Sequence, residues 1–127
     1  MLLNHIGLVS SSEEQSDRFF TKALGLTKVR TGTLSAELAR RLFDLDEDFT
    51  LLHYGDGELQ FEVFVPLHGD LAPHVMSHVC LEVTDRSTFL ERCRALGVAI
   101  VEAPKGDSLV VFVKDFDGNL FEIKEKR

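Results

Sequence analysis

The chain opens with the segment His5-Ile6-Gly7-Leu8-Val9, and a similar segment, His78-Val79-Cys80-Leu81-Glu82-Val83, begins its second half. Each segment leads through a polar stretch into a helical pattern. The two helical patterns end alike, at Ala23-Leu24-Gly25-Leu26 and at Ala95-Leu96-Gly97-Val98. From the histidine to that alanine there are 18 positions in the first half and 17 in the second. The chain is therefore predicted to contain the same structural unit twice, and such an internal repeat decides the fold.

The two halves also close alike, with Phe61-Glu62-Val63 in the first and Phe121-Glu122-Ile123 in the second. The first half is longer between its histidine and its glutamate. Residues 35–45 (SAELARRLFDL) supply most of the excess, and their leucines recur at i, i+4 and i+7, one face of a short helix. The first half therefore looks like the second with one helix inserted.

The pattern of each half is β-α-β-β-β, which predicts an α+β protein made of two βαβββ modules in tandem. The first module spans 1–66, with the inserted helix near 35–45; residues 67–77 form a linker; the second module spans 78–127. In the first module we expect a helix that opens at the capping box of Ser12, and strands at 3–9, 26–31, 49–54 and 58–65. In the second we expect a helix at 86–96 and strands at 78–84, 98–103, 108–114 and 119–125. Hairpin turns are expected at Gly55-Asp56-Gly57 and at Asp117-Gly118.

Composition and charge narrow the classes of function. The 127 residues are 44% hydrophobic, which allows a core, and the formal net charge is −7. An acidic chain is repelled by phosphate backbones and anionic lipids, so neither nucleic acid nor a membrane is an expected partner. Two isolated cysteines, the absence of a signal-peptide pattern and the absence of a long apolar run together predict a cytoplasmic protein.

The four repeated polar residues predict a metal site. Side chains alternate along a strand, so Glu62 and Glu122 lie on the face opposite to the apolar residues that should pack under the helices. A histidine and a glutamate from matched positions of each half give the set His5, Glu62, His78 and Glu122. Imidazole and carboxylate ligands suit Ni, Co, Zn, Mn or Fe better than Ca or Mg. Four ligands on a six-coordinate ion leave room for water or substrate. The competing interpretation is that each of these residues is structural or solvated.

Two further residues are candidates for substrate binding. Lys105, in the segment Pro104-Lys105-Gly106 before strand 108–114, is either a clamp for an anionic group or a solvated loop residue. His53 shares a strand face with Phe49 and Leu51 and lines the site or belongs to the core. The inserted helix is a lid, a specificity element or a dimer contact.

Several motifs resemble those of the vicinal oxygen chelate superfamily, the glyoxalase, bleomycin-resistance and extradiol-dioxygenase group. These are His5-Ile6-Gly7, the helix end Phe20–Gly25, Ser77-His78-Val79 and the closing DFDGNLFE of residues 115–122. The last resembles the family ending D-P-D-G-x-x-x-E, with Phe116 in place of proline. The resemblance implies a curved mixed sheet around a metal held by the first and last strands of each module, here His5, Glu62, His78 and Glu122.

Within the superfamily, different features resemble different members. The two-His, two-Glu set and Pro104-Lys105-Gly106 resemble glyoxalase I, which usually has a basic residue where this chain has Val9. The opening segment resembles methylmalonyl-CoA epimerase, which usually has glutamine at the position of Glu62. Extradiol dioxygenases use two histidines and one carboxylate.

These resemblances imply a divalent-metal-dependent lyase or isomerase, glyoxalase-like or epimerase-like. It would chelate a small-molecule substrate through vicinal oxygens and abstract a proton next to a carbonyl. Glu122 is expected as the catalytic base, with Glu62 as its counterpart for proton return, and a homodimer is expected. The site would form within one chain or across the dimer. The alternatives are a metal-free, bleomycin-resistance-like protein that sequesters a ligand, an extradiol-type dioxygenase, and a regulatory or structural module.

Overall fold

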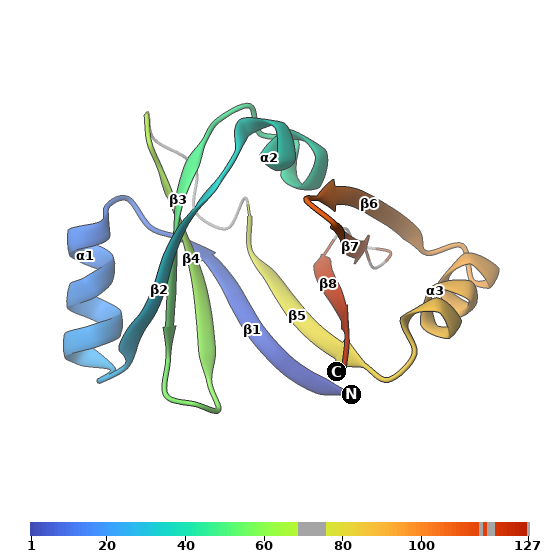
Figure 1. The fold of residues 1–127 in the computed structure, drawn as a ribbon, viewed down its shortest axis with the longest axis horizontal. Coiled ribbons are helices and arrows are strands. Elements are labelled where there is room, and N and C mark those ends of the chain that lie inside the picture. The colour runs from blue at the N-terminus through green and yellow to red at the C-terminus, as the bar shows by residue number, and fades with distance from the viewer. Residues whose placement is uncertain (69–75, 115, 117–118, 127) are drawn as a thin grey trace. The chain divides into compact units, whose positions relative to one another are not determined.

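In a computed structural model of the chain, residues 1–68, 76–114, 116 and 119–126 are described, and the protein is of the predicted α+β class (Figure 1). Each half has the βαβββ order, and the first half carries one extra helix, so the predicted pair of modules is confirmed. Contacts group His5–Ser77 into one compact unit and Met1–Asn4 with His78–Arg127 into another. The module boundaries at 66 and 78 stay a prediction. The turn at Asp117-Gly118 and most of the predicted linker lie outside the described residues.

The first module begins and ends its first helix by local signals. The Ser12 hydroxyl accepts a hydrogen bond from the Gln15 backbone N–H at 3.2 Å, as an N-cap does. The helix ends before Gly25, whose φ of 75° suits a residue without a side chain. Between these signals a short α-helix widens into a π-helix, which the sequence analysis did not predict. The elements are β1 (Leu2–Val9), α1 (Glu13–Asp17), η1 (Arg18–Ala23), β2 (Thr27–Leu34), α2 (Ala36–Phe43), β3 (Phe49–Gly55) and β4 (Gln60–Pro66).

The second module repeats this plan without the extra helix. Asp85 caps its helix by accepting a hydrogen bond from the Thr88 backbone N–H at 3.0 Å. Lys105 is the last residue of a strand, not a loop residue, and the turn follows at Gly106. The elements are β5 (His78–Val83), α3 (Arg86–Ala95), β6 (Ala99–Lys105), β7 (Ser108–Lys114) and β8 (Leu120–Glu125).

Strand pairing is the same in both modules. The first strand of each module lies parallel to the last, and the remaining pairs are antiparallel. The strand order is β2-β3-β4-β1 in the first module and β5-β8-β7-β6 in the second. Parallel pairing of the first and last strands brings two segments that are distant in sequence to one place, which positions the candidate site.

One face of each set of strands packs against its helix, as the alternation of side chains predicts. In the first module Phe20 of η1 stacks on Tyr54, with ring centroids 4.9 Å apart, and joins Val63 and Val65 in the core. In the second module Ile123 packs with Leu90 of α3. No helix of the described residues is long and apolar enough to cross a membrane.

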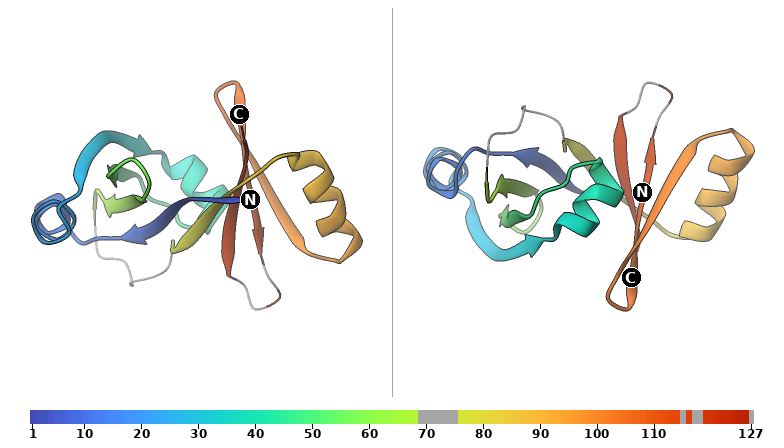
Figure 2. Two further views of the ribbon diagram at one scale, coloured as in Figure 1. Left: turned by 90° about the horizontal axis from the view of Figure 1, so that it is seen from below. Right: turned by 90° about the horizontal axis from the view of Figure 1, so that it is seen from above.

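The inserted helix α2 packs on the other face of the first module's strands. It begins at Ser35, whose hydroxyl accepts a hydrogen bond from the Leu38 backbone N–H at 3.2 Å. Phe43 near its end lies 5.7 Å from Phe64 of β4, centroid to centroid. Figure 2 shows α1 and α2 on opposite sides of these strands. Helix α2 therefore covers part of the face that carries Glu62, because Phe64 lies two positions from Glu62 on the same strand.

Candidate metal centre

The first module places His5 and Glu62 side by side on adjacent parallel strands. Gly7 of β1 is opposite Glu62 of β4 in the register, and His5 lies two positions earlier on the same face. The Nε2 atom of His5 is 3.5 Å from Oε2 of Glu62. The His5 side chain is 3% exposed and that of Glu62 15%. A buried imidazole and a half-buried carboxylate thus face one another.

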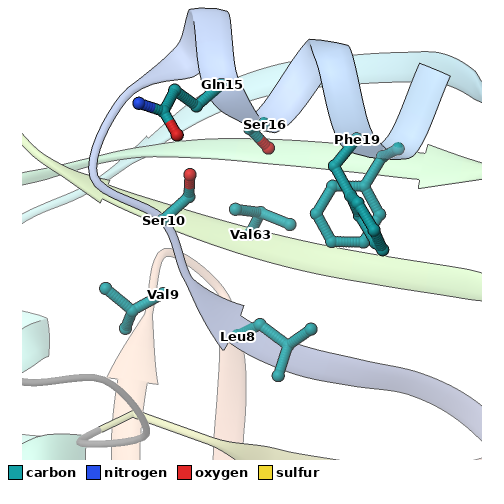
Figure 3. Close-up of a pocket in the computed structure, with 8 residues that line it drawn as sticks. Leu8, Val9, Ser10, Gln15, Ser16, Phe19 and Val63 are labelled. Carbon is teal, nitrogen blue, oxygen red and sulfur yellow. The ribbon is translucent and has the colours of Figure 1, made fainter. Parts of the chain in front are cut away.

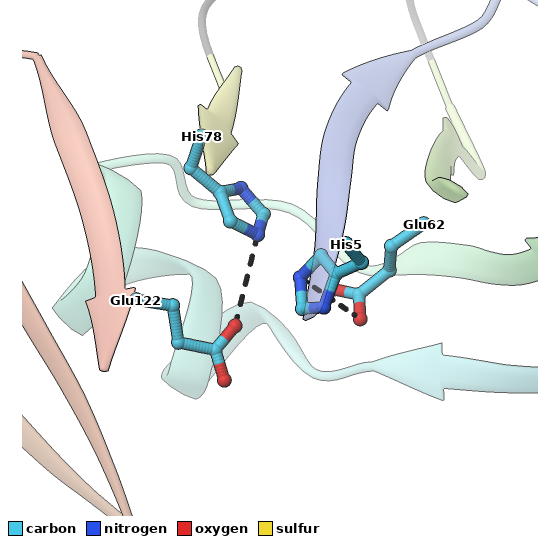
Figure 4. Close-up of side chains that lie close together, drawn as sticks. All are labelled: His5, Glu62, His78 and Glu122. Atoms are coloured by element: carbon cyan, nitrogen blue, oxygen red, sulfur yellow. Dashed lines mark ion pairs between the residues drawn. The ribbon is translucent and has the colours of Figure 1, made fainter. Parts of the chain in front are cut away.

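The second module builds a matching pair from His78 and Glu122. Cys80 of β5 is opposite Glu122 of β8, so the histidine again lies two positions before the residue that faces the glutamate. The Nε2 atom of His78 is 3.7 Å from Oε1 of Glu122, with side-chain exposures of 1% and 12% (Figure 4). The repeat in the sequence is therefore also a repeat in register.

The spacing of each pair fits two ligands of one metal ion. A direct hydrogen bond between imidazole and carboxylate would bring nitrogen and oxygen to about 2.7–3.2 Å. Two ligands bonded at about 2.1 Å to a common ion lie roughly 3.0–3.4 Å apart in octahedral or tetrahedral geometry. The observed 3.5 and 3.7 Å are closer to the second arrangement. Nitrogen and carboxylate oxygen donors also match the predicted transition metals. Each pair can therefore supply two ligands to a divalent ion.

The first pair has a polar neighbour in His53, one of the two residues predicted as candidates for substrate binding. His53 of β3 is directly opposite Glu62 of β4, and its Nε2 atom is 3.2 Å from Glu62 Oε2. On its other side, Arg30 of β2 is opposite His53 and places Nη2 3.2 Å from the same Nε2 atom. Arg30 was missed altogether, because its place beside His53 depends on strand register. Arg30, His53 and Glu62 thus form a polar row across three strands.

The second pair has an apolar neighbour at the matching position. Phe112 of β7 is opposite Glu122 of β8, where His53 is opposite Glu62 in the first module. Val101 of β6 is opposite Phe112, in the place that corresponds to Arg30. The Phe112 ring lies 5.2 Å from the His78 ring, centroid to centroid. The two modules therefore share the histidine and the glutamate but surround them differently.

The other predicted site residue, Lys105, is exposed at the end of β6. Within the described residues its ammonium group makes no hydrogen bond or ion pair. Its backbone carbonyl accepts a hydrogen bond from the Ser108 hydroxyl at 2.8 Å. The structure thus describes a role for Lys105 in the turn, and substrate binding by its side chain stays a prediction.

A pocket of about 340 Å³ lies in the first module between its first helix and the strands (Figure 3). Its walls come from β1, from α1 and η1, and from Val63 of β4. Leu8, Phe20 and Val63 in those walls belong to the hydrophobic core under the helix. Neither His5 nor Glu62 lines it. The pocket therefore lies between the first helix and the strands and is separate from the His5–Glu62 pair.

The fold and the two pairs define a protein of two βαβββ modules, each with a histidine and a glutamate that can ligate a metal. The profile of the Glyoxalase/Bleomycin resistance protein/Dioxygenase superfamily matches residues 2–123. The chain belongs to this superfamily, as its motifs predicted. A search of curated protein sequences found no match.

Solved structures share the fold at low sequence identity. A hypothetical protein from Bacillus halodurans C-125 superposes with a TM-score of 0.70 at 18% identity, over 98% of this chain and 94% of that one. Methylmalonyl-CoA epimerase from Mycobacterium tuberculosis gives 0.67 at 18% identity, over 98% and 87%. A mutant of 4-hydroxymandelate synthase from Streptomyces coelicolor gives 0.71 at 11% identity, over 98% of this chain and 47% of that one. At these identities the likeness is one of fold.

Proposed function

We propose that this protein is a divalent-metal-dependent lyase or isomerase that abstracts a proton next to a carbonyl. In this proposal the two His–Glu pairs hold one ion, and a small substrate binds through two neighbouring oxygens. The observation that carries the proposal is the repeat of the same pair in the same register, His5 with Glu62 and His78 with Glu122. A single buried pair could arise for structural reasons, whereas a matched pair in both modules supplies a complete set of four ligands.

The residues of the chain divide the work as follows. The bound ion supplies a Lewis acid that polarises the two substrate oxygens. Glu122 takes the proton from the carbon next to the carbonyl. Glu62, after it takes a proton from water, returns that proton on the other side, while Glu122 gives its proton to water; the hydrogen-bond partner His53 holds Glu62 in place. The buried imidazoles of His5 and His78 keep their orientation because strand neighbours surround them. The named epimerase among the similar folds is an example of such proton transfer, and it supports the proposal as an analogy.

Metal content tests the proposal first. The protein, purified without a histidine tag, is analysed by plasma mass spectrometry after incubation with Ni, Co, Zn, Mn and Fe in turn. Near one equivalent of one metal is expected in the parent and a sharp loss in Glu122→Ala. Glu102→Ala is the matched control, since Glu102 is an exposed strand glutamate that pairs with Arg94 at 3.6 Å. A parent that takes up none of the five metals would overturn the proposal in favour of a ligand-sequestering protein.

Proton transfer tests the chemistry directly. The metal-loaded protein is incubated in deuterated water with the hemithioacetal of methylglyoxal and glutathione, and separately with a 2-methyl-branched acyl-CoA. Deuterium at the carbon next to the carbonyl, followed by NMR, is the expected result for one of the two classes. Exchange that is equally fast with Glu122→Ala would contradict the assignment of Glu122 as the base.

A homodimer and a cytoplasmic location also belong to the proposal. The homodimer rests on the resemblance to the superfamily, and the location rests on the two isolated cysteines. Light scattering on the purified protein measures the first, and cell fractionation the second.

A further inference from the structure

The Nε2 atom of His53 has two polar neighbours but can bond only one of them. Arg30 Nη2 and Glu62 Oε2 each lie 3.2 Å from it. A guanidinium group only donates hydrogen bonds, and a carboxylate only accepts them. A ring nitrogen either carries a hydrogen or offers a lone pair. One of the two contacts is therefore a hydrogen bond and the other is mere proximity.

The other ring nitrogen decides between them. Among the described residues, Nδ1 of His53 is buried and has no hydrogen-bond partner. If Nε2 accepted from Arg30, a neutral ring would have to carry its hydrogen on Nδ1, and a buried N–H without an acceptor would result. If Nε2 donates to Glu62, only a lone pair is left unpartnered at Nδ1, and the donated bond is charge-assisted. The geometry favours a bond from His53 to Glu62.

Arg30 is then left with its donors available. Its side chain is exposed, and within the described residues it forms no ion pair with a carboxylate. The register shift between Lys28 and Arg30 is a β-bulge, which turns Arg30 onto the face of His53 and Glu62. Bulges often re-aim a side chain next to an active site. Two positions further on, Gly32 has open space where a Cβ would be. The strand face that carries Arg30 is therefore open at Gly32.

We propose that Arg30, resting on His53, binds a carboxylate of the substrate. This inference rests on the proposed function, because it assumes that the reacting oxygens of the substrate bind to a metal ion held by Glu62. Arg30 Nη2 and Glu62 Oε2 both contact His53 Nε2 at 3.2 Å, so they are separated by at most twice that distance. A carboxylate held by Arg30 through one oxygen can therefore direct its other oxygen, together with the neighbouring oxygen on C2, toward Glu62. The substrate class that fits is a small 2-oxo or 2-hydroxy acid.

Charge supports the same class. The two glutamates of the proposed site balance a divalent ion, and Arg30, which pairs with no carboxylate among the described residues, adds one positive charge that a substrate anion can match. A planar guanidinium group can bind a carboxylate through two parallel hydrogen bonds. A neutral ester of the same acid cannot form this pair as an ion.

The test compares 2-oxobutyrate with its methyl ester. Binding of each is measured by saturation-transfer NMR and calorimetry, with the protein both loaded with cobalt and stripped of metal. We expect the parent to bind the acid about tenfold more tightly than the ester, as for one charge-assisted bond. Arg30→Gln should lose this preference, Arg30→Lys should keep part of it, and Arg40→Gln should leave it intact. Arg40 is the matched control because it is an exposed arginine of the same module, paired with Asp46 at 2.6 Å.

The outcomes separate the two proposals. Loss of acid preference in Arg30→Gln with unchanged cobalt content supports both the subsite and the metal site. A parent that takes up no cobalt overturns the proposed function, and the metal-free comparison of acid and ester then decides the subsite alone. A parent without acid preference, or an Arg30→Gln variant that keeps it, overturns the subsite. Circular dichroism confirms that the variants are folded.

Discussion

The two modules share one backbone plan but differ in what lies beside the site glutamate. In the first module the cross-strand neighbours of Glu62 are His53 and, beyond it, Arg30. In the second module the matching neighbours of Glu122 are Phe112 and Val101. A histidine can hold a carboxylate by a hydrogen bond, whereas an aromatic ring at the same position donates none. Repeated modules can thus keep the same pair of polar residues and surround it with different neighbours.

The difference extends to the core. Tyr54, the residue after His53, is fully buried, and its hydroxyl donates to Asp17 Oδ1 at 2.7 Å. Lys28 Nζ lies 3.0 Å from the same carboxylate. The matching residue in the second module is Val113, which has no polar group to place. The first module therefore ties its helix α1 to its strands through a buried phenol, whereas the second ties α3 to its strands through Arg86, whose guanidinium donates to the Ile123 carbonyl at 3.3 Å.

The largest effect is expected when Glu122 is replaced. Glu122→Gln should lower the rate of deuterium exchange into substrate by about 10²–10⁴-fold, the usual contribution of a general base. Glu62→Gln should lower the exchange rate less, because His53 holds Glu62 in one orientation and leaves it less free to act as the base. Both rates are divided by the metal content of the same sample. Equal losses in the two variants would show that the modules share the work evenly.

A smaller effect is expected when the first module is made to resemble the second. His53→Phe copies Phe112 and removes the hydrogen bond to Glu62. Loss of such a partner of a metal ligand costs about 10–100-fold in metal affinity or activity. Competition with a fluorescent chelator measures the affinity. Phe112→Leu is the control, since it removes an aromatic ring from the second module without removing a hydrogen bond. An equal loss of metal affinity in this control would mean that packing, and not the hydrogen bond, is responsible.

Tyr54→Phe should weaken the first module's polar tie. The free energy of unfolding should fall by about 1.5–3 kcal/mol, the contribution of a hydrogen bond to a charged group. Urea denaturation at neutral pH measures it. Burial is the main cause that raises the pKa of Tyr54 to about 12. The phenol's contribution is therefore complete below its ordinary pKa of 10.0 and is lost as the pH rises toward 12. The gap between parent and variant should close over that range; a constant gap would contradict the assignment.

The smallest effect is expected on stability when Asp17 is replaced, and it depends on acid pH. The hydrogen bond from Tyr54, followed by the interaction with Lys28, lowers the pKa of Asp17 from its usual 3.8. A lowered pKa adds stability above 3.8, and that stability is lost as the pH falls through the lowered value. The pair is partly exposed, so Asp17→Asn should cost less than about 1 kcal/mol at pH 7, and the cost should shrink as the pH falls through the lowered pKa. Melting temperatures across this range are the measurement. Asp46→Asn, which alters a surface ion pair on α2, is the control.

Much of the fold could be predicted from local patterns. Strand positions agree within a few residues, and Ser12, Gly25 and the inserted helix act as predicted. The widened helix at Arg18–Ala23 was not predicted, because periodicity alone does not separate an α-helix from a single π-turn. Both His–Glu pairs followed from the repeat, since matched positions on matched strands must share a face.

The polar row beside Glu62 could not be predicted in the same way. Without the bulge, Val29 would be the residue opposite His53. The side chain of Arg30 would then lie on the other face of the sheet. A bulge depends on how two strands pair, which the spacing of residues within one strand does not reveal.

The sequence by itself determined the two-module plan and the four candidate ligands, because both follow from periodicity and repetition along the chain, and its motifs resembled those of the superfamily that the profile match shows. Only the tertiary structure decided which side chains stand beside those ligands. Cross-strand neighbours are distant in sequence and depend on register, and a shift of one residue in register moves a side chain to the other face of the sheet. The unlike surroundings of Glu62 and Glu122 are therefore a property of the folded chain.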